Sequence, residues 1–232
     1  MISEVLPAGA RGAESFGEQD EIALEALLPQ ESEAISHAGV RRRQEFAAVR
    51  HGARQALAAL GLPPAALLPD QAGAPLWPAG VVGSMTHCTG YRASAVALRQ
   101  DIASLGIDAE PNSPLPAGTR RLVLLPPEVE RARELDTVRP SVAWTRLLFC
   151  AKEAAYKAWY TLTGQPLNSG DVEIVVNPEG TVAAAISLTP GGRTVPTLRG
   201  RWLVRDNLLL VALAVPRPSR PSSEPQRHRG HP

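Results

Sequence analysis

The chain has 232 residues, of which 44% are hydrophobic and 20% are charged, as in an ordinary globular protein with one large or two small domains. Its 24 Lys and Arg residues nearly cancel its 23 Asp and Glu residues, so it offers no broad basic surface for nucleic acid or for an anionic membrane. Any anion that it binds must be small and held by a local cluster of cations.

Targeting signals and disulfide patterns do not stand out in the sequence. Residues 1–20 are polar and acidic and lack the basic and apolar regions of a signal peptide. The longest apolar run, at 208–215, is too short to cross a bilayer. Cys88 and Cys150 form no CxxC pair, which suits a reducing compartment. We therefore expect a cytoplasmic protein.

Residues 41–64 carry the first strong helix pattern. Apolar residues recur there at steps of three and four, and Gly61 is followed by two prolines that end the helix. After a Pro- and Gly-rich loop, residues 81–111 predict strand, loop, strand, turn and strand, with the turn at 99–101. On this interpretation His87 lies in the loop between the first two strands.

The second part of the chain repeats the order of helix and strands. Past a Pro-rich connector the sequence is helical after Pro127, and 141–164 predicts a second strong amphipathic helix. Strands are then expected at 171–176 and 181–188, followed by a hairpin over 199–215 that turns at Asp206-Asn207.

These elements predict an α+β fold, a pseudo-two-fold arrangement of two similar halves, each a helix packed on an antiparallel sheet. We expect the N-terminal half to span 1–112 and the C-terminal half 113–215. The tail, 216–232, is rich in Pro, Ser and Arg and is expected to be disordered.

Asp108 and Glu110, in the sequence GIDAEP, are the first candidates for chemistry. Side chains two apart in a strand share a face, so the two carboxylates repel each other unless a cation or a proton lies between them. For such a pair taken alone, a solvated strand face is the more common explanation. Their position at the end of an apolar strand, directly before Pro111, instead favours a Mg-phosphate site.

Glu153 and Lys157 are one helical turn apart in AKEAAYKAW, a spacing that also suits a simple surface ion pair. The apolar and aromatic residues around them favour a pocket wall instead. His87 is either a structural histidine or a phosphate contact, and a zinc site with Cys88 and Cys150 lacks a fourth ligand.

Five arginines of the first helix form either a solvated basic face or an anion pocket, since arginine suits bidentate phosphate binding. They are Arg41, Arg42, Arg43, Arg50 and Arg54.

Three segments in this order resemble the motifs of the surfactin- and enterobactin-type (group II) 4'-phosphopantetheinyl transferases: GSMTHC at 83–88, GIDAE at 106–110 and FCAKEAAYKAW at 149–159. The Arg-rich helix and TLRGRW at 197–202 are similar to actinobacterial members of that family. The resemblance extends from about residue 40 to about residue 215.

The resemblance implies an enzyme that moves the phosphopantetheine arm of coenzyme A to a serine of an apo acyl, peptidyl or aryl carrier protein and releases 3',5'-ADP. It implies that Asp108, Glu110 and Glu153 hold Mg²⁺, or Mn²⁺ in its place. Glu153 is then the general base, Lys157 stabilises the leaving phosphate and His87 holds a phosphate oxygen. Since one chain supplies both halves of the site, a monomer is expected.

The resemblance also implies a set of coenzyme A contacts, among which Lys152 is the weaker candidate. They are Arg42, Arg43, Arg50, Thr86, His87, Lys152 and Lys157.

One segment departs from the family pattern. Where the family reads close to KGxxGEPxWP, this chain reads PDQAGAPLWP, so Pro69 replaces a lysine and Ala72 and Ala74 replace other charged positions. We expect weaker coenzyme A binding than in relatives, or compensation by Arg43 or Arg54.

A non-catalytic relative that binds coenzyme A or a carrier protein without turnover is the main alternative, supported only by the altered loop. A Mg-dependent phosphohydrolase or nucleotidyl transferase uses similar carboxylates but explains neither the helix motif nor the arginines. The carrier is expected to dock on TRRLVLLPP, through Arg120, Arg121, Leu122 and Leu125.

Overall fold

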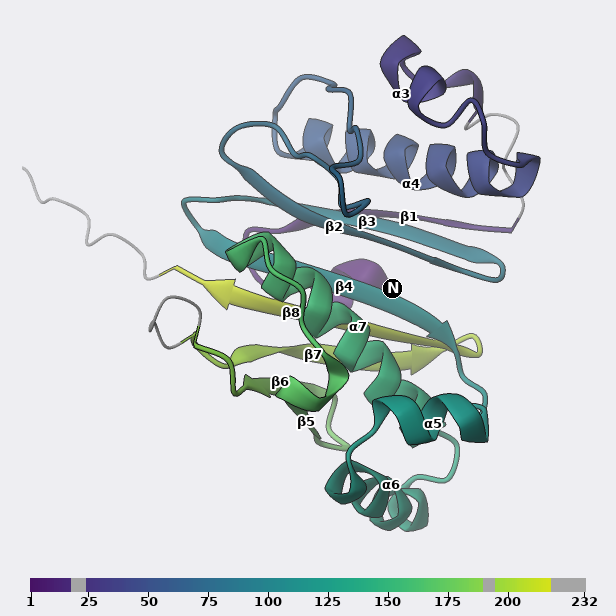
Figure 1. Cartoon of the computed structure of the whole chain (residues 1–232), viewed down its shortest axis with the longest axis vertical. Helices are drawn as coiled ribbons and strands as arrows, with labels where there is room; N and C mark the ends of the chain where they lie inside the picture. The colour runs from purple at the N-terminus through teal and green to yellow at the C-terminus, as the bar shows by residue number, and fades with distance from the viewer. Residues whose placement is uncertain (18–23, 190–194, 218–232) are drawn as a thin grey trace, which may run out of the picture.

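The computed structural model describes residues 1–17, 24–189 and 195–217 and arranges them around two antiparallel sheets (Figure 1). The first sheet has the strand order β1 (Arg11–Phe16), β3 (Tyr91–Leu98) and β2 (Val81–Cys88). The second has the order β4 (Ile102–Pro111), β8 (Leu208–Pro216), β7 (Leu198–Arg205), β6 (Thr181–Ile186) and β5 (Val172–Val176). The helices are α1 (Ile2–Val5), α3 (Pro29–Ala34), α4 (Val40–Ala59), α5 (Ala117–Val123), α6 (Pro126–Val138) and α7 (Trp144–Thr163), with a 3₁₀ turn η1 (Ser169–Asp171).

Helix α4 covers the first sheet and helix α7 packs across the second (Figure 1). The predicted α+β class, with helices packed on antiparallel sheets, is therefore confirmed. The boundary proposed at residue 112 stays a prediction, and β4 from the first half pairs with β8 from the second. The predicted disorder of the tail concerns mainly residues 218–232, which lie outside the described residues.

Helix α4 forms where the apolar spacing predicted it. Phe46, Val49, Ala53 and Leu57 are buried against the first sheet, and the chain leaves the helix through Gly61 at φ +75°. A left-handed φ favours glycine, so this residue suits the stop signal that the sequence carries.

The three strands predicted over 81–111 are confirmed, with β4 in the second sheet, and one expectation is corrected. His87 lies within strand β2, opposite Arg92 of β3, and not in a loop. The two strands are joined by a turn at Thr89 and Gly90, with Gly90 at φ +74°. Because a two-residue turn needs so little chain, the pairing continues up to Cys88 and fixes His87 at the end of a rigid strand.

Strands β2 and β4 belong to different sheets and are bridged by side-chain hydroxyls. Ser84 Oγ accepts a hydrogen bond from the backbone N–H of Ile107 at 3.0 Å, and Thr86 Oγ1 accepts one from Ala109 at 3.1 Å. These hydroxyls satisfy buried backbone donors of β4, whose ladder partner is β8. The two sheets are thus held together beside Asp108.

Helix α7 lies unusually close to β4. A Cβ atom on Gly106 would lie 2.0 Å from the carbonyl oxygen of Ala154, so the contact requires glycine. The hydroxyl of Ser104 donates to the carbonyl oxygen of Ala158 in the same interface. This close packing brings the polar edge of α7 to the carboxylates of β4.

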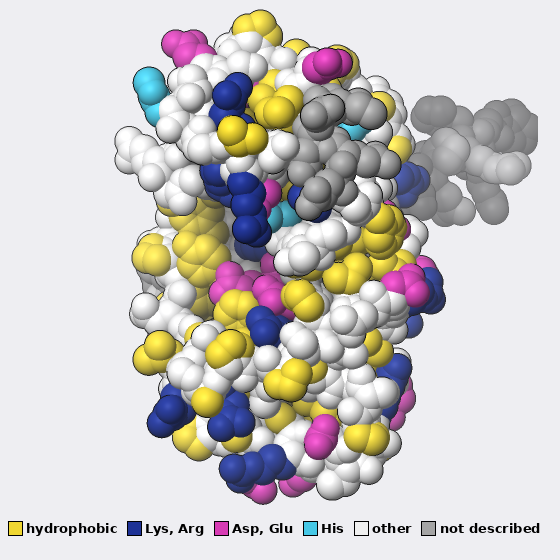
Figure 2. Space-filling model, turned by 90° about the vertical axis from the view of Figure 1, so that its right-hand side faces the viewer, with side chains coloured by type: hydrophobic (Ala, Val, Ile, Leu, Met, Phe, Trp, Pro, Cys, Tyr) yellow, Lys and Arg dark blue, Asp and Glu magenta, His cyan; other side chains and the backbone are white. Residues whose placement is uncertain are grey.

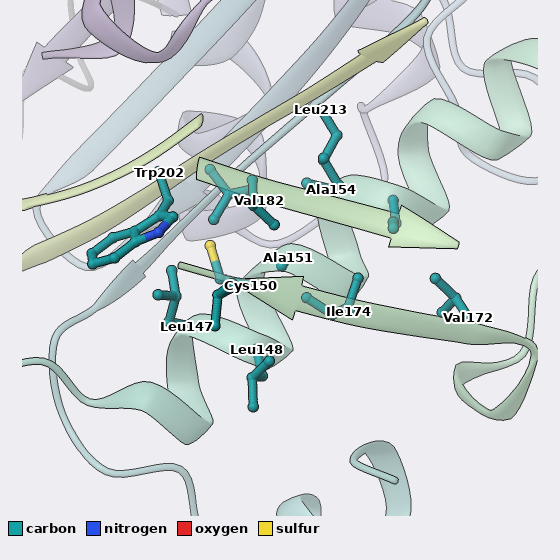
Figure 3. Close-up of a cluster of buried hydrophobic side chains, with 14 of the residues drawn as sticks. Leu147, Leu148, Cys150, Ala151, Ala154, Val172, Ile174, Val182, Trp202 and Leu213 are labelled. Carbon is teal, nitrogen blue, oxygen red and sulfur yellow. The ribbon is translucent and has the colours of Figure 1, made fainter. Parts of the chain in front are cut away.

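The amphipathic helix predicted over 141–164 is present as α7, and its buried apolar face forms the larger core together with the second sheet. Figure 3 shows Leu147, Cys150, Ala151 and Ala154 of the helix facing the strand side chains.

In the expected hairpin, β7 and β8 are joined by Asp206 at φ 51° and Asn207 at φ 59°, which is the geometry of a type I′ turn. In the described part of the chain, no helix has the length and apolar character needed to span a bilayer.

Candidate active site

Asp108 is the most constrained carboxylate of the site. Its Oδ1 accepts hydrogen bonds from Thr86 Oγ1 at 2.9 Å and from Lys157 Nζ at 2.7 Å. Its Oδ2 is buried and accepts no hydrogen bond from a nitrogen or hydroxyl donor of the described residues, while the nearby carboxylate helps burial to raise the pKa of the Cys150 thiol. A buried oxygen without a donor is costly, so this atom needs a cation or a proton donor.

Glu110 lies on the same strand and is held by a cation that sequence reasoning missed. Arg146 Nη1 lies 3.0 Å from Glu110 Oε2, and the guanidinium also donates to the carbonyl oxygens of Ser113 and Pro114. Burial and the charge of Asp108 raise the pKa of Glu110, while Arg146 opposes that shift. The sequence carried a signal for Arg146, because it lies two helical turns before Glu153 and therefore on the same face of α7.

Glu153 and Lys157 extend from helix α7 toward the strand carboxylates. Lys157 Nζ donates to Asp108 Oδ1 and, at 3.1 Å, to the carbonyl oxygen of Ile107, so its ammonium joins α7 to β4. Burial raises the pKa of Glu153, and the charge of Asp108 raises it further. A carboxylate with a raised pKa is a better proton acceptor near neutral pH.

A cavity of about 660 Å³ opens beside these residues. Its walls come from α4, the loop before β2, strand β2 and α7, and they include Arg42, Glu45, Arg50, His87, Glu153 and Lys157. Figure 2 shows acidic side chains gathered in the hollow at mid-height, with basic side chains above them. The cavity therefore presents carboxylates and cations to the same bound molecule.

His87 and Arg42 share a carboxylate that the sequence reasoning did not single out. Glu45 Oε2 lies 3.3 Å from His87 Nε2 and 4.0 Å from Arg42 Nη1. Burial lowers the pKa of His87, and the charge of Glu45 opposes this effect. The sequence carried a signal for this contact, because Glu45 follows Arg42 by three residues and such residues are neighbours on the surface of a helix.

Arg50 lines the cavity but is only 5% exposed. Its Nε donates to the carbonyl oxygen of Leu67 at 2.7 Å, and its guanidinium lies over the ring of Phe46. Burial lowers the pKa of Arg50 to about 10. The residue therefore anchors the loop that follows α4 in addition to facing the cavity.

Three other predicted residues lie elsewhere in the described structure. Lys152 is buried on the opposite side of α7, where its Nζ lies 3.1 Å from Glu128 and donates to two carbonyl oxygens. The expectation that Lys152 contacts a phosphate is therefore wrong. Arg54 Nη1 donates to both carboxylate oxygens of buried Glu31, which removes Arg54 as a compensating cation. Arg43 is not among the cavity-lining residues.

Thr86 was expected to contact coenzyme A, but its side chain is hydrogen-bonded to Asp108 instead. It is 3% exposed, donates to Asp108 and accepts from the N–H of Ala109. Its contribution is to hold the carboxylate in place.

The donor set fits a hard divalent cation. Asp108 has an unpartnered buried oxygen, and its charge raises the pKa of both Glu110 and Glu153, as expected for carboxylates that approach one another. Among the described residues no three acidic, His or Cys side chains form a ready-made cage. Mg²⁺ commonly takes only one or two protein carboxylates together with water and phosphate oxygens, so an open site is compatible with it.

Comparison with known proteins identifies the family of the chain. Two family models match the chain: the 4'-phosphopantetheinyl transferase N-terminal domain over residues 30–97 and the 4'-phosphopantetheinyl transferase superfamily over residues 104–203. The chain is 46% identical to 4'-phosphopantetheinyl transferase Svp of Streptomyces mobaraensis, over 97% of this chain and 93% of that protein.

Two further relatives cover most of the chain. The identity is 42% with 4'-phosphopantetheinyl transferase Npt of Nocardia iowensis, over 92% of this chain and 99% of that protein. It is 41% with 4'-phosphopantetheinyl transferase PptT of Mycobacterium tuberculosis, over 93% and 98%. The chain therefore belongs to the 4'-phosphopantetheinyl transferase superfamily, as an enzyme of the group II type related to PptT.

Proposed function

We propose that this transferase moves the phosphopantetheine arm of coenzyme A to a serine of an apo acyl, peptidyl or aryl carrier protein, in a reaction that depends on Mg²⁺ and releases 3',5'-ADP. The observation that carries the proposal is the hydrogen bond from Lys157 to Asp108 beside a cavity that Lys157 lines together with Glu153, Arg42 and His87. Carboxylates and cations at one cavity match a substrate with several phosphates.

Asp108, Glu110 and Glu153 are the residues that would hold Mg²⁺, with Mn²⁺ as a substitute. When bound, the ion neutralises charge on the diphosphate of coenzyme A. The ammonium of Lys157 lies 2.7 Å from one oxygen of Asp108 and compensates part of the charge of this buried carboxylate. Arg146 does the same for Glu110.

In the transfer step, the serine oxygen of the carrier forms a bond to the phosphorus that bears the pantetheine arm. The bond between that phosphorus and the oxygen bridging to the 5'-phosphate breaks, and 3',5'-ADP leaves with the electron pair. Glu153 accepts the serine proton, directly or through a water, and the raised pKa suits this role. Lys157 stabilises the charge that grows on the leaving phosphate.

Arg42 and His87 are proposed to contact phosphate oxygens of coenzyme A. Both line the cavity, and Arg42 has an exposed side chain that lies 4.0 Å from Glu45 Oε2. An arginine at such a distance from its partner can turn to a phosphate at low cost.

The carrier protein is proposed to dock on helix α5 and the residues after it. Leu122 is 84% exposed, and Arg120 and Arg121 lie beside it. An apolar residue flanked by two cations suits an acidic helical partner. Reversal of both arginines to glutamate is expected to raise the KM for the carrier, and an unchanged KM would refute this site.

The chain is proposed to act as a monomer, because β4 with Asp108 and α7 with Glu153 come from one chain. Light scattering of the purified protein measures its mass in solution directly. A stable oligomer would contradict the proposal.

The decisive experiment is intact mass spectrometry of apo carrier proteins incubated with the enzyme, coenzyme A and Mg²⁺. We expect a mass gain of one phosphopantetheine arm, lost in Glu153→Ala and kept in the control Glu173→Gln, which changes an exposed residue of β5. A carrier with its serine replaced by alanine separates transfer from hydrolysis. Coenzyme A binding without any mass gain on several carriers would favour the non-catalytic alternative.

A further inference from the structure

The loop at residues 69–75, called here the 69–75 loop, is organised by the side chain of Asp70. Asp70 Oδ1 accepts hydrogen bonds from the backbone N–H groups of Ala72 at 2.8 Å and Ala74 at 2.9 Å. Its backbone N–H donates to the carbonyl oxygen of Ala74 at 2.8 Å, and Pro69 pairs with Pro75 at the base. The loop is therefore a closed turn with its own internal bonds.

The second oxygen of Asp70 connects this loop to the helix that bears Glu153. Tyr160 Oη donates to Asp70 Oδ2 at 2.7 Å, between residues that are 90 positions apart in the sequence. Tyr160 follows Lys157 by three residues on α7, and its ring stacks on Tyr156 with the centroids 6.4 Å apart. Asp70 and Tyr160 both line the cavity, so this bond joins two of its walls.

The 69–75 loop has little means of attracting an anion by charge. It contains no Lys or Arg, and its single ionisable side chain is the carboxylate of Asp70. The N–H groups of Ala72 and Ala74 donate to that carboxylate and are therefore not free to bind a phosphate. Its contribution to binding must therefore come from shape and from being held in place.

We propose that the Asp70–Tyr160 hydrogen bond is a positioning contact that holds the 69–75 loop as one wall of the coenzyme A site and so sets the affinity for coenzyme A. The inference rests on the proposed function and adds to it two residues that act before the chemical step. A wall fixed in advance spares the entropy of ordering the loop when the substrate binds. The transfer step itself, which involves Glu153 and Lys157, does not depend on this contact.

The test is Tyr160→Phe, which removes the hydroxyl and keeps the ring that stacks on Tyr156. For a half-buried hydrogen bond to a carboxylate we expect the KM for coenzyme A and the Kd for 3',5'-ADP to rise about threefold to tenfold. The kcat and the KM for the carrier should remain within about twofold of wild type, as expected for an interaction that is equal in ground and transition states. In an Asp70→Ala background, Tyr160→Phe should cost nothing further.

A matched control is Arg205→Gln, which removes an exposed pair between Arg205 and Glu4 at 2.6 Å. This control should leave both constants unchanged. Equal KM values for wild type and Tyr160→Phe, or a fall in kcat together with a fall in Tm, would overturn the inference. A wild-type chain that binds no coenzyme A would overturn the proposed function as well, so the two failures are distinguishable.

Discussion

Lys157 and Asp108 form the contact that joins the two motif-bearing elements of the site. Nζ of Lys157 lies 2.7 Å from Oδ1 of Asp108, whereas Oδ2 of the same carboxylate is buried without a partner in the described structure. The ammonium compensates part of the negative charge on β4. The oxygen Oδ2 therefore remains available as a ligand for a cation that arrives with the substrate or from the solvent.

The first prediction concerns Asp108. Asp108→Asn keeps the shape of the side chain but removes the charge that pairs with Lys157. We expect kcat to fall by about 10²–10³-fold, the usual loss when one electrostatic contact to the transition state is removed. Carrier modification followed by mass spectrometry measures the rate. Asp136→Asn, at an exposed position of α6, is the control, and equal rates for the two variants would contradict the role of Asp108.

The second prediction concerns the dependence of stability on pH in metal-free buffer. Burial and neighbouring charges raise the pKa of Glu153 and Glu110 in the folded state, so the folded state binds more protons than the unfolded state between the ordinary and the raised pKa. Stability therefore falls as pH rises through this window. Thermal unfolding with a chelator should show the Tm of wild type falling relative to that of Glu153→Gln as the pH rises above 4.5.

The same reasoning applies to a variant. Glu153→Gln removes one ionisation penalty and should raise Tm in metal-free buffer at pH 7, at about 2–4 °C for each kcal/mol gained. Added Mg²⁺ should stabilise wild type more than Glu153→Gln. A Tm that is lower in Glu153→Gln than in the Glu173→Gln control would show that the carboxylate stabilises the fold, contrary to this account.

The third prediction concerns Arg146. Its guanidinium lowers the pKa of Glu110 against the opposing effect of burial, so Arg146→Gln should raise that pKa further. If ionised Glu110 is needed for turnover, the acid limb of the pH–rate profile should move to higher pH, with activity recovered at alkaline pH. Arg131→Gln, which breaks an exposed pair on α6, should leave the profile unchanged. An unmoved acid limb in Arg146→Gln would remove Glu110 from the set of ionisations that limit the rate.

The fourth prediction concerns the departure at Pro69. Pro69 lines the cavity, and Arg54, a possible substitute for the missing lysine, is bound to Glu31 instead. A charged hydrogen bond to a phosphate contributes about 1.5–3 kcal/mol. Pro69→Lys should therefore bind coenzyme A about tenfold or more tightly in calorimetry, unless the loop loses its shape. Equal affinities would show that the lysine is not missed at this position.

The fifth prediction concerns the packing of α7 on β4. A Cβ on Gly106 would overlap the backbone of Ala154, which has no flexible end to move aside. Gly106→Ala should lower the free energy of unfolding by about 1–3 kcal/mol or more, the usual cost of overpacking. Gly118→Ala is the matched control, because nothing lies within 4 Å of its Cβ position in α5. Denaturant unfolding of both variants makes the comparison, and equal midpoints would contradict the close contact.

The sequence by itself determined the elements whose signals are local. Helices α4 and α7 follow from apolar residues at helical spacing, and the β7–β8 hairpin follows from Asp206-Asn207 between two apolar runs. The motif residues Asp108, Glu110, Glu153 and Lys157 were likewise readable, because each motif is a short run of chain. These signals depend on neighbours in the sequence and need no knowledge of the fold.

The tertiary structure alone decided which of these residues meet. Lys152 and Glu153 are adjacent, yet the helix sends Lys152 to Glu128 in the core and Glu153 to the cavity. The edge strand β1 escaped prediction because its polar and apolar residues do not alternate clearly and its pairing with β3 comes from distant residues.

The contacts that complete the site are long-range for the same reason. Arg146 reaches Glu110 across 36 positions, and Tyr160 reaches Asp70 across 90. A pairing between distant residues depends on how β4 and α7 pack, and that packing is set by Gly106 and the shared core. Most of the proposed reacting groups could therefore be identified from the sequence. Their contact partners could not, because charge and hydrogen-bond energies depend on distances that only the packing of the fold sets.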